Sequence, residues 1–103
     1  APILFSSQIG AKPRPALILS SKRYNQASDD IVVLKITSKG KDYPFDVQLT
    51  EKDMAEGELK YESVIQADFP VVIEKQIIIQ KIGRIKEQKL REVKQKLKEL
   101  FNL

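Results

Sequence analysis

The sequence contains neither cysteine nor histidine. Without cysteine the chain has no disulfide, no thiolate nucleophile and no zinc–thiolate site, and a reducing compartment suits it. Without histidine, a Ser-His-Asp triad and the common histidine-containing metal sites are excluded. An enzyme of this composition has to move protons with carboxylates, Arg, Lys, Tyr, hydroxyl groups or water. We therefore expect chemistry that needs no metal and no cofactor.

Long hydrophobic runs are also missing. No apolar segment approaches the roughly 20 residues of a membrane-spanning helix. No basic residues precede the short apolar stretch at the start, as they would in a signal peptide. We therefore expect a cytoplasmic protein that makes no contact with a membrane. Because the chain opens within a strand-like segment and without Met, we also expect part of the first strand to precede Ala1.

The size and charge of the chain indicate how many domains it forms and which partners suit it. Its 103 residues are 42% hydrophobic and 31% charged, which fits one globular domain over residues 1–103 with one modest core. The formal net charge is +4, from 18 basic and 14 acidic residues. An excess of this sign favours a polyanionic partner such as nucleic acid, although an ordinary solvated helix face accounts for it as well.

Most of the chain consists of short segments rich in β-branched residues, separated by polar connections. Residues 6–12 have the composition of a flexible loop, residues 22–26 that of a polar connection with one helical turn, and residues 51–58 that of an irregular acidic excursion. Gly83 marks a turn. The predicted strands are residues 2–5, 16–20, 31–36, 45–49, 63–67, 71–74 and 77–82.

Residues 86–101 have the periodicity of an amphipathic helix with one narrow apolar stripe. The stripe consists of Leu90, Val93, Leu97 and either Leu100 or Phe101. Six or seven short strands followed by one helix predict a mainly β fold. We expect a small, strongly bent barrel, or paired antiparallel sheets, closed at one end by the helix. An open α+β sheet, the alternative, would need more helix to cover it.

Arg14 stands between two prolines in a basic loop, residues 12–15, that leads into an apolar strand. Each proline fixes its own φ and biases the preceding residue toward extended geometry, so the backbone around Arg14 is stiff before any ligand arrives. The guanidinium has five fixed donors and a permanent charge, which suit a phosphate. The alternative is a solvated arginine, or one paired with a surface carboxylate.

Four further polar residues lie at the ends of two predicted strands. Thr37 and Ser38 follow one strand, and Gln66 and Asp68 lie around the end of a later one. Strand ends converge on one rim of a compact barrel, where such groups could hold a phosphodiester and stabilise its developing charge. The alternatives are that the hydroxyls close a turn, that Gln66 points outward, and that Asp68 forms a turn.

Without histidine or metal ligands, this set of groups suggests attack by an RNA 2′-hydroxyl on its own neighbouring phosphate. The substrate then supplies the nucleophile, and the protein supplies positioning and electrostatic stabilisation. DNA lacks this hydroxyl, so such a site would distinguish the two nucleic acids.

The order of several segments resembles the MazF/PemK family of toxin endoribonucleases, and the resemblance covers nearly the whole chain. The strongest matches are RPALILS at residues 14–20 and ITSK at residues 36–39. IGRI at residues 82–85, followed by a helix, adds to them. Weaker matches are Tyr24-Asn25, residues 44–47 and residues 63–65.

This resemblance implies an SH3-like barrel of the CcdB/MazF type that forms a homodimer and inhibits growth by cleaving single-stranded mRNA. Cleavage would occur at short sequences, without metal, and leave a 2′,3′-cyclic phosphate. It also implies a cognate antitoxin, whose acidic C-terminal segment occupies the same groove, and DNA binding together with that antitoxin. By motif, Arg14 matches the family's catalytic arginine and Thr37 its catalytic hydroxyl. The expected RNA-binding residues are Lys12, Ser38, Lys39, Gln66 and Asp68.

The chain departs from the family pattern at three places. The usual Gly-Asp-(Val/Ile)-Val strand is missing ahead of Ala1, and Lys86 stands where a Ser or Thr helix cap is usual. Residues 68–71 read Asp-Phe-Pro-Val, where many members have Asp-Gln followed by Arg or Lys. We therefore expect a substrate preference unlike that of the well-known members.

Two other functions stay open at this point. One is a non-catalytic barrel that binds RNA or a protein through its basic rim. The other is a CcdB-like toxin that targets a protein, as the gyrase-poisoning relatives do. The combination of Arg14 with ITSK argues against the second, because those relatives lack it.

Overall fold

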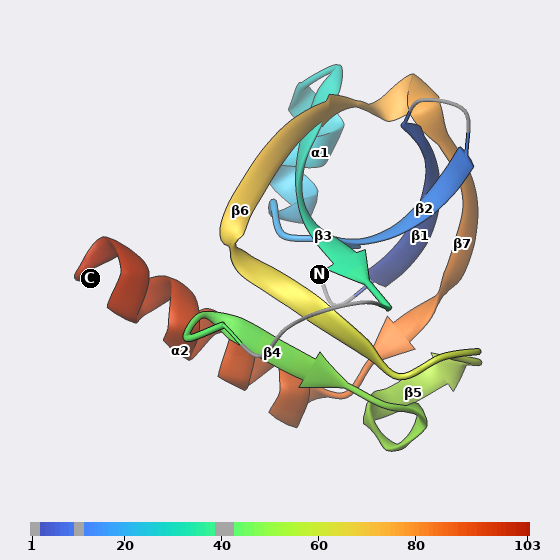
Figure 1. Ribbon diagram of the computed structural model, residues 1–103. Coiled ribbons are helices and arrows are strands. Elements are labelled where there is room, and N and C mark those ends of the chain that lie inside the picture. Colours follow the sequence, from blue (N-terminus) through green and yellow to red (C-terminus); the bar gives the residue numbers. More distant parts are fainter. Residues whose placement is uncertain (1–2, 10–11, 39–42) are drawn as a thin grey trace.

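Seven antiparallel strands form one curled sheet, and a long C-terminal helix packs against part of it (Figure 1). The computed structural model describes residues 3–9, 12–38 and 43–103. The strand order is β4-β6-β3-β2-β1-β7-β5. This confirms the predicted mainly β fold with one C-terminal amphipathic helix. The elements are β1 (Ile3–Ile9), β2 (Lys12–Ile18), α1 (Lys22–Ala27), β3 (Asp30–Thr37), β4 (Asp46–Leu49), the 3₁₀ turn η1 (Glu51–Asp53), β5 (Met54–Gly57), β6 (Ser63–Glu74), the 3₁₀ turn η2 (Lys75–Ile77), β7 (Ile78–Ile85) and α2 (Glu87–Phe101).

The main core lies between one face of the sheet and α2. Leu4, Leu17 and Leu34 are opposite one another on β1, β2 and β3, and all three are fully buried. Leu90 and Val93 of α2 belong to the same cluster. Burying each such side chain stabilises the fold by about 1.5–3 kcal/mol, so these contacts hold the helix on the sheet.

A second, smaller core lies on the opposite face of the same strands. It contains Phe5, Ala16, Ile31, Val33 and Ile73. Successive side chains of a strand point to opposite faces, so both faces of the central strands carry apolar residues over part of their length. This explains why β3 has a nearly continuous β-branched sequence.

The apolar stripe of α2 agrees with the predicted periodicity. Leu90 and Val93 are buried and Leu97 packs against the same core, whereas Phe101 is 56% exposed. Leu100 is half-buried, so it continues the stripe in place of Phe101. Among the helices that the structure describes, none combines the length and hydrophobicity needed to cross a membrane.

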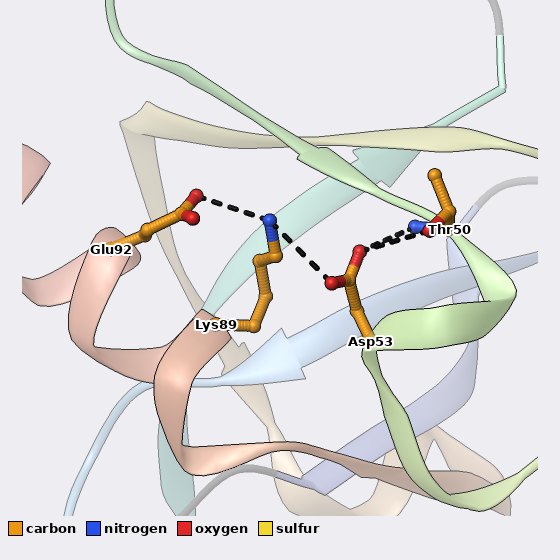
Figure 2. A network of polar contacts seen from close by, with 4 residues as sticks. All are labelled: Thr50, Asp53, Lys89 and Glu92. Carbon is orange, nitrogen blue, oxygen red and sulfur yellow. Dashed lines mark hydrogen bonds and ion pairs between the residues drawn. The ribbon is translucent and has the colours of Figure 1, made fainter.

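Contacts with η1 hold the start of α2, and Thr50, the residue before η1, in turn contacts Asp53 of η1 (Figure 2). Lys86 occupies the N-cap and provides no side-chain cap, but its backbone N–H donates to the Asp53 carbonyl at 2.8 Å. The Lys89 ammonium lies 3.7 Å from the Asp53 carboxylate and 3.1 Å from that of Glu92. Asp53 also accepts a hydrogen bond of 2.8 Å from the Thr50 backbone N–H. These contacts tie the first turn of α2 to η1, although no side chain caps the helix.

The prediction of loops at residues 6–12 and 12–15 was wrong for residues 6–9 and 12–15, which are strand, whereas residues 10 and 11 lie outside the described residues. Residues 6–9 continue β1, which pairs with β2 on one side and β7 on the other, so pairing overrides the loop-like composition. Pro13 and Pro15 lie within β2, opposite Gln8 and Ser6 of β1. The ladder between β2 and β3 runs over Ala16–Ile18. The prolines therefore occupy a part of β2 where no N–H is needed on the β3 side.

Three other boundaries differ from the prediction. Residues 63–67 and 71–74 belong to one strand, β6, because β4 pairs with its first part and β3 pairs along both parts. Residues 51–58, predicted to be irregular, form the 3₁₀ turn η1 and then a short strand, β5. Gly83 lies inside β7 rather than at a turn.

Gly83 faces Gly57 across the β5–β7 pair. A Cβ atom on Gly83 would lie 2.2 Å from the Glu56 carbonyl oxygen, and one on Gly57 would lie 2.3 Å from the Ile82 carbonyl oxygen. Gly57 also has a φ of +80°, which side chains disfavour. The two glycines therefore allow an unusually close approach of the two strands.

An exposed ion pair beside these glycines gives a first prediction. Arg84 of β7 donates to the Glu56 carboxylate at 3.0 Å, and Lys81 lies 3.7 Å from it. The hydrogen bond and charge of Arg84, followed by the charge of Lys81, lower the pKa of Glu56 from its ordinary 4.5. Because the folded-state pKa is depressed, the stabilisation is present above the unfolded pKa and is lost as pH falls through the folded value.

We expect Arg84→Gln to raise the pKa of Glu56 toward its ordinary value in an NMR titration of the side-chain carboxyl group. The matched control is Lys89→Gln, which removes a cation elsewhere and should leave the Glu56 titration unchanged. Added salt should reduce the difference between wild type and Arg84→Gln, because the pair is exposed. An identical Glu56 pKa in wild type and Arg84→Gln would show that the pair does not form.

Candidate active site

The strand register places four polar side chains on one face of the sheet. Ala16 of β2 is opposite Lys35 of β3. Side chains two positions apart share a face, so Arg14 lies on the face of Ala16, and Thr37 on the face of Lys35. Ile36, between the last two, points to the other face and into the main core. Arg14 and Thr37 are therefore brought to the same side of two adjacent strands.

Gln66 reaches this face from β6. The pairing of Thr37 with Val64 and of Ile36 with Ile65 puts the next β6 residue, Gln66, beside Lys35. Beyond this point the ladder shifts: the next pair is Leu34 with Pro70, so the four residues 66–69 of β6 face Lys35 alone. β6 bends midway along its length in Figure 1. The interruption opens the sheet next to Lys35.

A hollow of about 380 Å³ lies where these strands separate. Its volume falls in the range of small-molecule and cofactor sites. The small side chain of Ala16, which is itself buried, leaves room on this face between the longer polar groups. Figure 1 shows β2 and β6 on either side of β3. The residues that line the hollow are Arg14, Pro15, Ala16, Lys35, Ile36, Thr37 and Gln66.

The hollow is electrostatically suited to an anion. Arg14 is exposed, and Lys35, Thr37 and Gln66 are half-buried. Of the described residues that line it, two are cationic and none is a carboxylate. Donors in a partly desolvated site interact more strongly with a phosphate than they would in bulk water. The arrangement can bind a phosphodiester and neutralise charge that develops on it.

A larger hollow, of about 580 Å³, has the opposite character. It lies at the other end of β3 and β6, and the Nζ of Lys75, its lysine, donates to the Asn25 carbonyl at 2.6 Å. Its carboxylates would repel a polyanion, so the smaller hollow is the candidate site despite its size. The larger one is lined by Asp29, Asp30, Glu74, Lys75 and Gln76.

Of the residues that the sequence singled out, the structure brings Arg14, Thr37 and Gln66 together in one hollow. Ser38 and Asp68 are exposed and are not among its lining residues. The roles assigned to these five residues stay predictions. Two other predicted RNA-binding residues are not tested: Lys39 lies outside the described residues, and so does the side chain of Lys12.

Lys35 is the lining residue that the sequence reasoning missed. The residues on one face of β3 are Ile31, Val33, Lys35 and Thr37. Ile31 and Val33 are buried in the smaller core, so the face changes from apolar to polar at Lys35. This alternation identifies Lys35 as a neighbour of Thr37.

Comparison with solved structures shows where this fold occurs. The structure of this chain is similar to that of an endoribonuclease in complex with its cognate antitoxin from a mycobacterial species. The TM-score is 0.84 at 18% identity, and the match covers 99% of this chain and 93% of that chain. The Mycobacterium tuberculosis toxin MazF-mt6 gives a TM-score of 0.82 at 20% identity, with coverage of 100% and 98%. At these identities the likeness shows the fold alone, and it confirms the predicted MazF-type barrel.

A third similar structure is the MazE–MazF complex from Deinococcus radiodurans, with a TM-score of 0.83, 28% identity, and coverage of 100% of this chain and 94% of that chain. No curated protein sequence gives a significant match. Residues 3–101 match the family described as the PemK-like, MazF-like toxins of type II toxin–antitoxin systems. Because this match spans almost the whole sequence, the chain belongs to the PemK-like, MazF-like toxin family, whose members are generally endoribonucleases.

Proposed function

We propose that this protein cleaves single-stranded RNA, mRNA in the cell, by attack of a ribose 2′-hydroxyl on the adjacent phosphodiester. The observation that supports this proposal most directly is the meeting of Arg14, Lys35, Thr37 and Gln66 in one hollow, where none of the described lining residues is a carboxylate. Membership of a toxin family with endoribonuclease members supports the same reaction class.

The reaction needs only the protein, the substrate and water. The 2′-oxygen loses its proton to solvent and bonds to phosphorus, and the bond from phosphorus to the 5′-oxygen breaks. The departing 5′-oxygen takes up a proton, which leaves a 2′,3′-cyclic phosphate on one fragment and a 5′-hydroxyl on the other. Negative charge increases on the non-bridging oxygens in the transition state, so donors placed there lower the barrier.

Four of the lining residues, those with polar side chains, have a role in this proposal. Arg14 donates two hydrogen bonds to the non-bridging oxygens, and the Thr37 hydroxyl donates a third from the adjacent strand. Lys35 adds positive charge at the base of the hollow. Gln66 orients the ribose or the phosphate through its amide. The protein holds the substrate in position before the reaction. This positioning is the main source of rate enhancement when the nucleophile belongs to the substrate.

We further propose that the protein acts in the cytoplasm as a homodimer and is inhibited by a cognate antitoxin. An extended acidic segment of the antitoxin would occupy the same positively charged hollow as the RNA. The similar Deinococcus radiodurans protein is a complex of MazE with MazF, which supports a partner of this kind.

The reaction is tested by incubating the protein with a mixture of single-stranded RNAs in EDTA. We expect cleavage to continue in the chelator and to give fragments with 2′,3′-cyclic phosphate ends. Single-stranded DNA of the same sequences should stay intact, because it lacks the attacking hydroxyl. Cleavage that stops in EDTA, or fragments that carry other ends, would contradict the mechanism. If the protein binds the RNA but leaves it intact, the result would favour the non-catalytic barrel.

A further inference from the structure

Phe69 is a solvent-exposed aromatic residue beside the hollow. It lies on the segment of β6 that faces Lys35, three positions after Gln66, and its side chain is 54% exposed. It belongs to neither core cluster. The fold therefore does not depend on this ring for packing.

Lys35 links this ring to the hollow. Its Nζ lies over the Phe69 ring, 4.9 Å from the centroid, within the range of a cation–π contact. The same lysine lines the hollow together with Arg14 and Thr37. One side chain thus contacts both the phosphate-binding surface and the ring, which places the ring at the edge of the hollow.

The backbone presents the ring rigidly. Pro70 follows Phe69 directly and restricts it to extended geometry. Pro70 is also paired with Leu34, which is fully buried in β3. The backbone at Phe69 therefore loses little conformational freedom when a ligand stacks on the ring.

We propose that Phe69, backed by Lys35, is the platform on which one base of the RNA stacks while the adjacent phosphate occupies the hollow. This inference rests on the proposed function for the identity of the ligand. Proteins that hold single strands combine a positively charged groove with aromatic side chains on which bases stack. Lys35 covers one face of the ring, and the base stacks on the other. Purines have the larger π surface, so the platform favours a purine at this position.

The test measures binding of probes that cannot be cleaved. Fluorescent 2′-O-methyl oligoadenylate is compared with an abasic 2′-O-methyl oligomer of the same length, and dissociation constants are obtained from anisotropy. We expect Phe69→Ala to weaken binding of the oligoadenylate about tenfold and to leave binding of the abasic oligomer unchanged. Phe69→Trp should keep the affinity for oligoadenylate.

The matched control is Val72→Ala, which shortens another exposed apolar side chain of β6, 60% exposed, and should change neither affinity. Thermal unfolding of all variants checks that the fold is retained. Equal weakening of both probes by Phe69→Ala, or no weakening of either, would overturn the stacking platform.

The two proposals fail in different ways. If wild type cleaves RNA but Phe69→Ala binds oligoadenylate as wild type does, the platform is wrong and the reaction stands. If wild type leaves RNA intact but binds oligoadenylate through Phe69, the reaction is wrong and the platform stands.

Discussion

Arg14→Ala is expected to lower the rate of RNA cleavage by about 10²–10³, the cost of removing one donor to the charge that develops in a transition state. The guanidinium is exposed at the hollow and belongs to neither core cluster, so its removal leaves no buried cavity. The unfolding temperature should therefore stay close to that of wild type. The measurement is kcat/KM on a single-stranded RNA whose cleavage position has been mapped.

Two further variants identify the cause of the loss. Arg14→Lys keeps the charge but not the fork of parallel donors, so it should restore only part of the rate. Arg23→Ala removes an exposed arginine of α1, outside the hollow, and should cleave as wild type does. If Arg23→Ala lost as much activity as Arg14→Ala, net charge rather than the geometry of the hollow would explain the effect.

Gly83→Ala is expected to reduce the free energy of unfolding by about 1–3 kcal/mol, the usual cost of inserting a carbon where there is no space. Its Cβ would meet the Glu56 carbonyl oxygen at 2.2 Å, and both groups are part of the backbone. β5 must therefore move away from β7. Met54, the first residue of β5, belongs to the main core and would move with it.

The effect is measured by thermal unfolding, where a loss of 1 kcal/mol corresponds to about 4–8 °C in a domain of this size. Gln80→Ala changes an exposed residue of the same strand and should alter the unfolding temperature little. Gly57→Ala combined with Gly83→Ala should cost less than the sum of the single changes, because both open the same contact. An unchanged unfolding temperature in Gly83→Ala would mean that the strands can separate freely.

The parts of the fold that the sequence predicted well have strong local periodicity. The stripe of α2 begins at Leu90 and Val93, which are buried as expected, and the apolar run of β3 forms the centre of the sheet. The parts that were predicted wrongly depend on partners distant in the sequence. Residues 6–8 are polar and become strand through pairing with β2 and β7. Pro70 suggested a break, yet β6 continues through it.

The same distinction applies to the candidate site. Arg14 and Thr37 could be chosen because they flank apolar strands, and the structure places both in one hollow. The alternation along β3 places Lys35 beside Thr37, but its position opposite residues 66–69 could not be predicted, because that depends on the register shift between β3 and β6. The contact between Lys35 and Phe69 follows from that same shift. Local sequence patterns carry no information about such a shift.

The connection between β3 and β6 also bears on the order of folding. β1, β2 and β3 follow one another along the chain and lie side by side in the sheet, whereas β6 pairs with β3 only after β4 and β5 have intervened. Contacts between neighbours in sequence form faster than distant ones. A nascent chain can thus bring the Arg14 guanidinium and the Thr37 hydroxyl together early, while Gln66 and Phe69 arrive later, when β6 pairs with β3. The proposed site would then be completed only when β6 docks on β3.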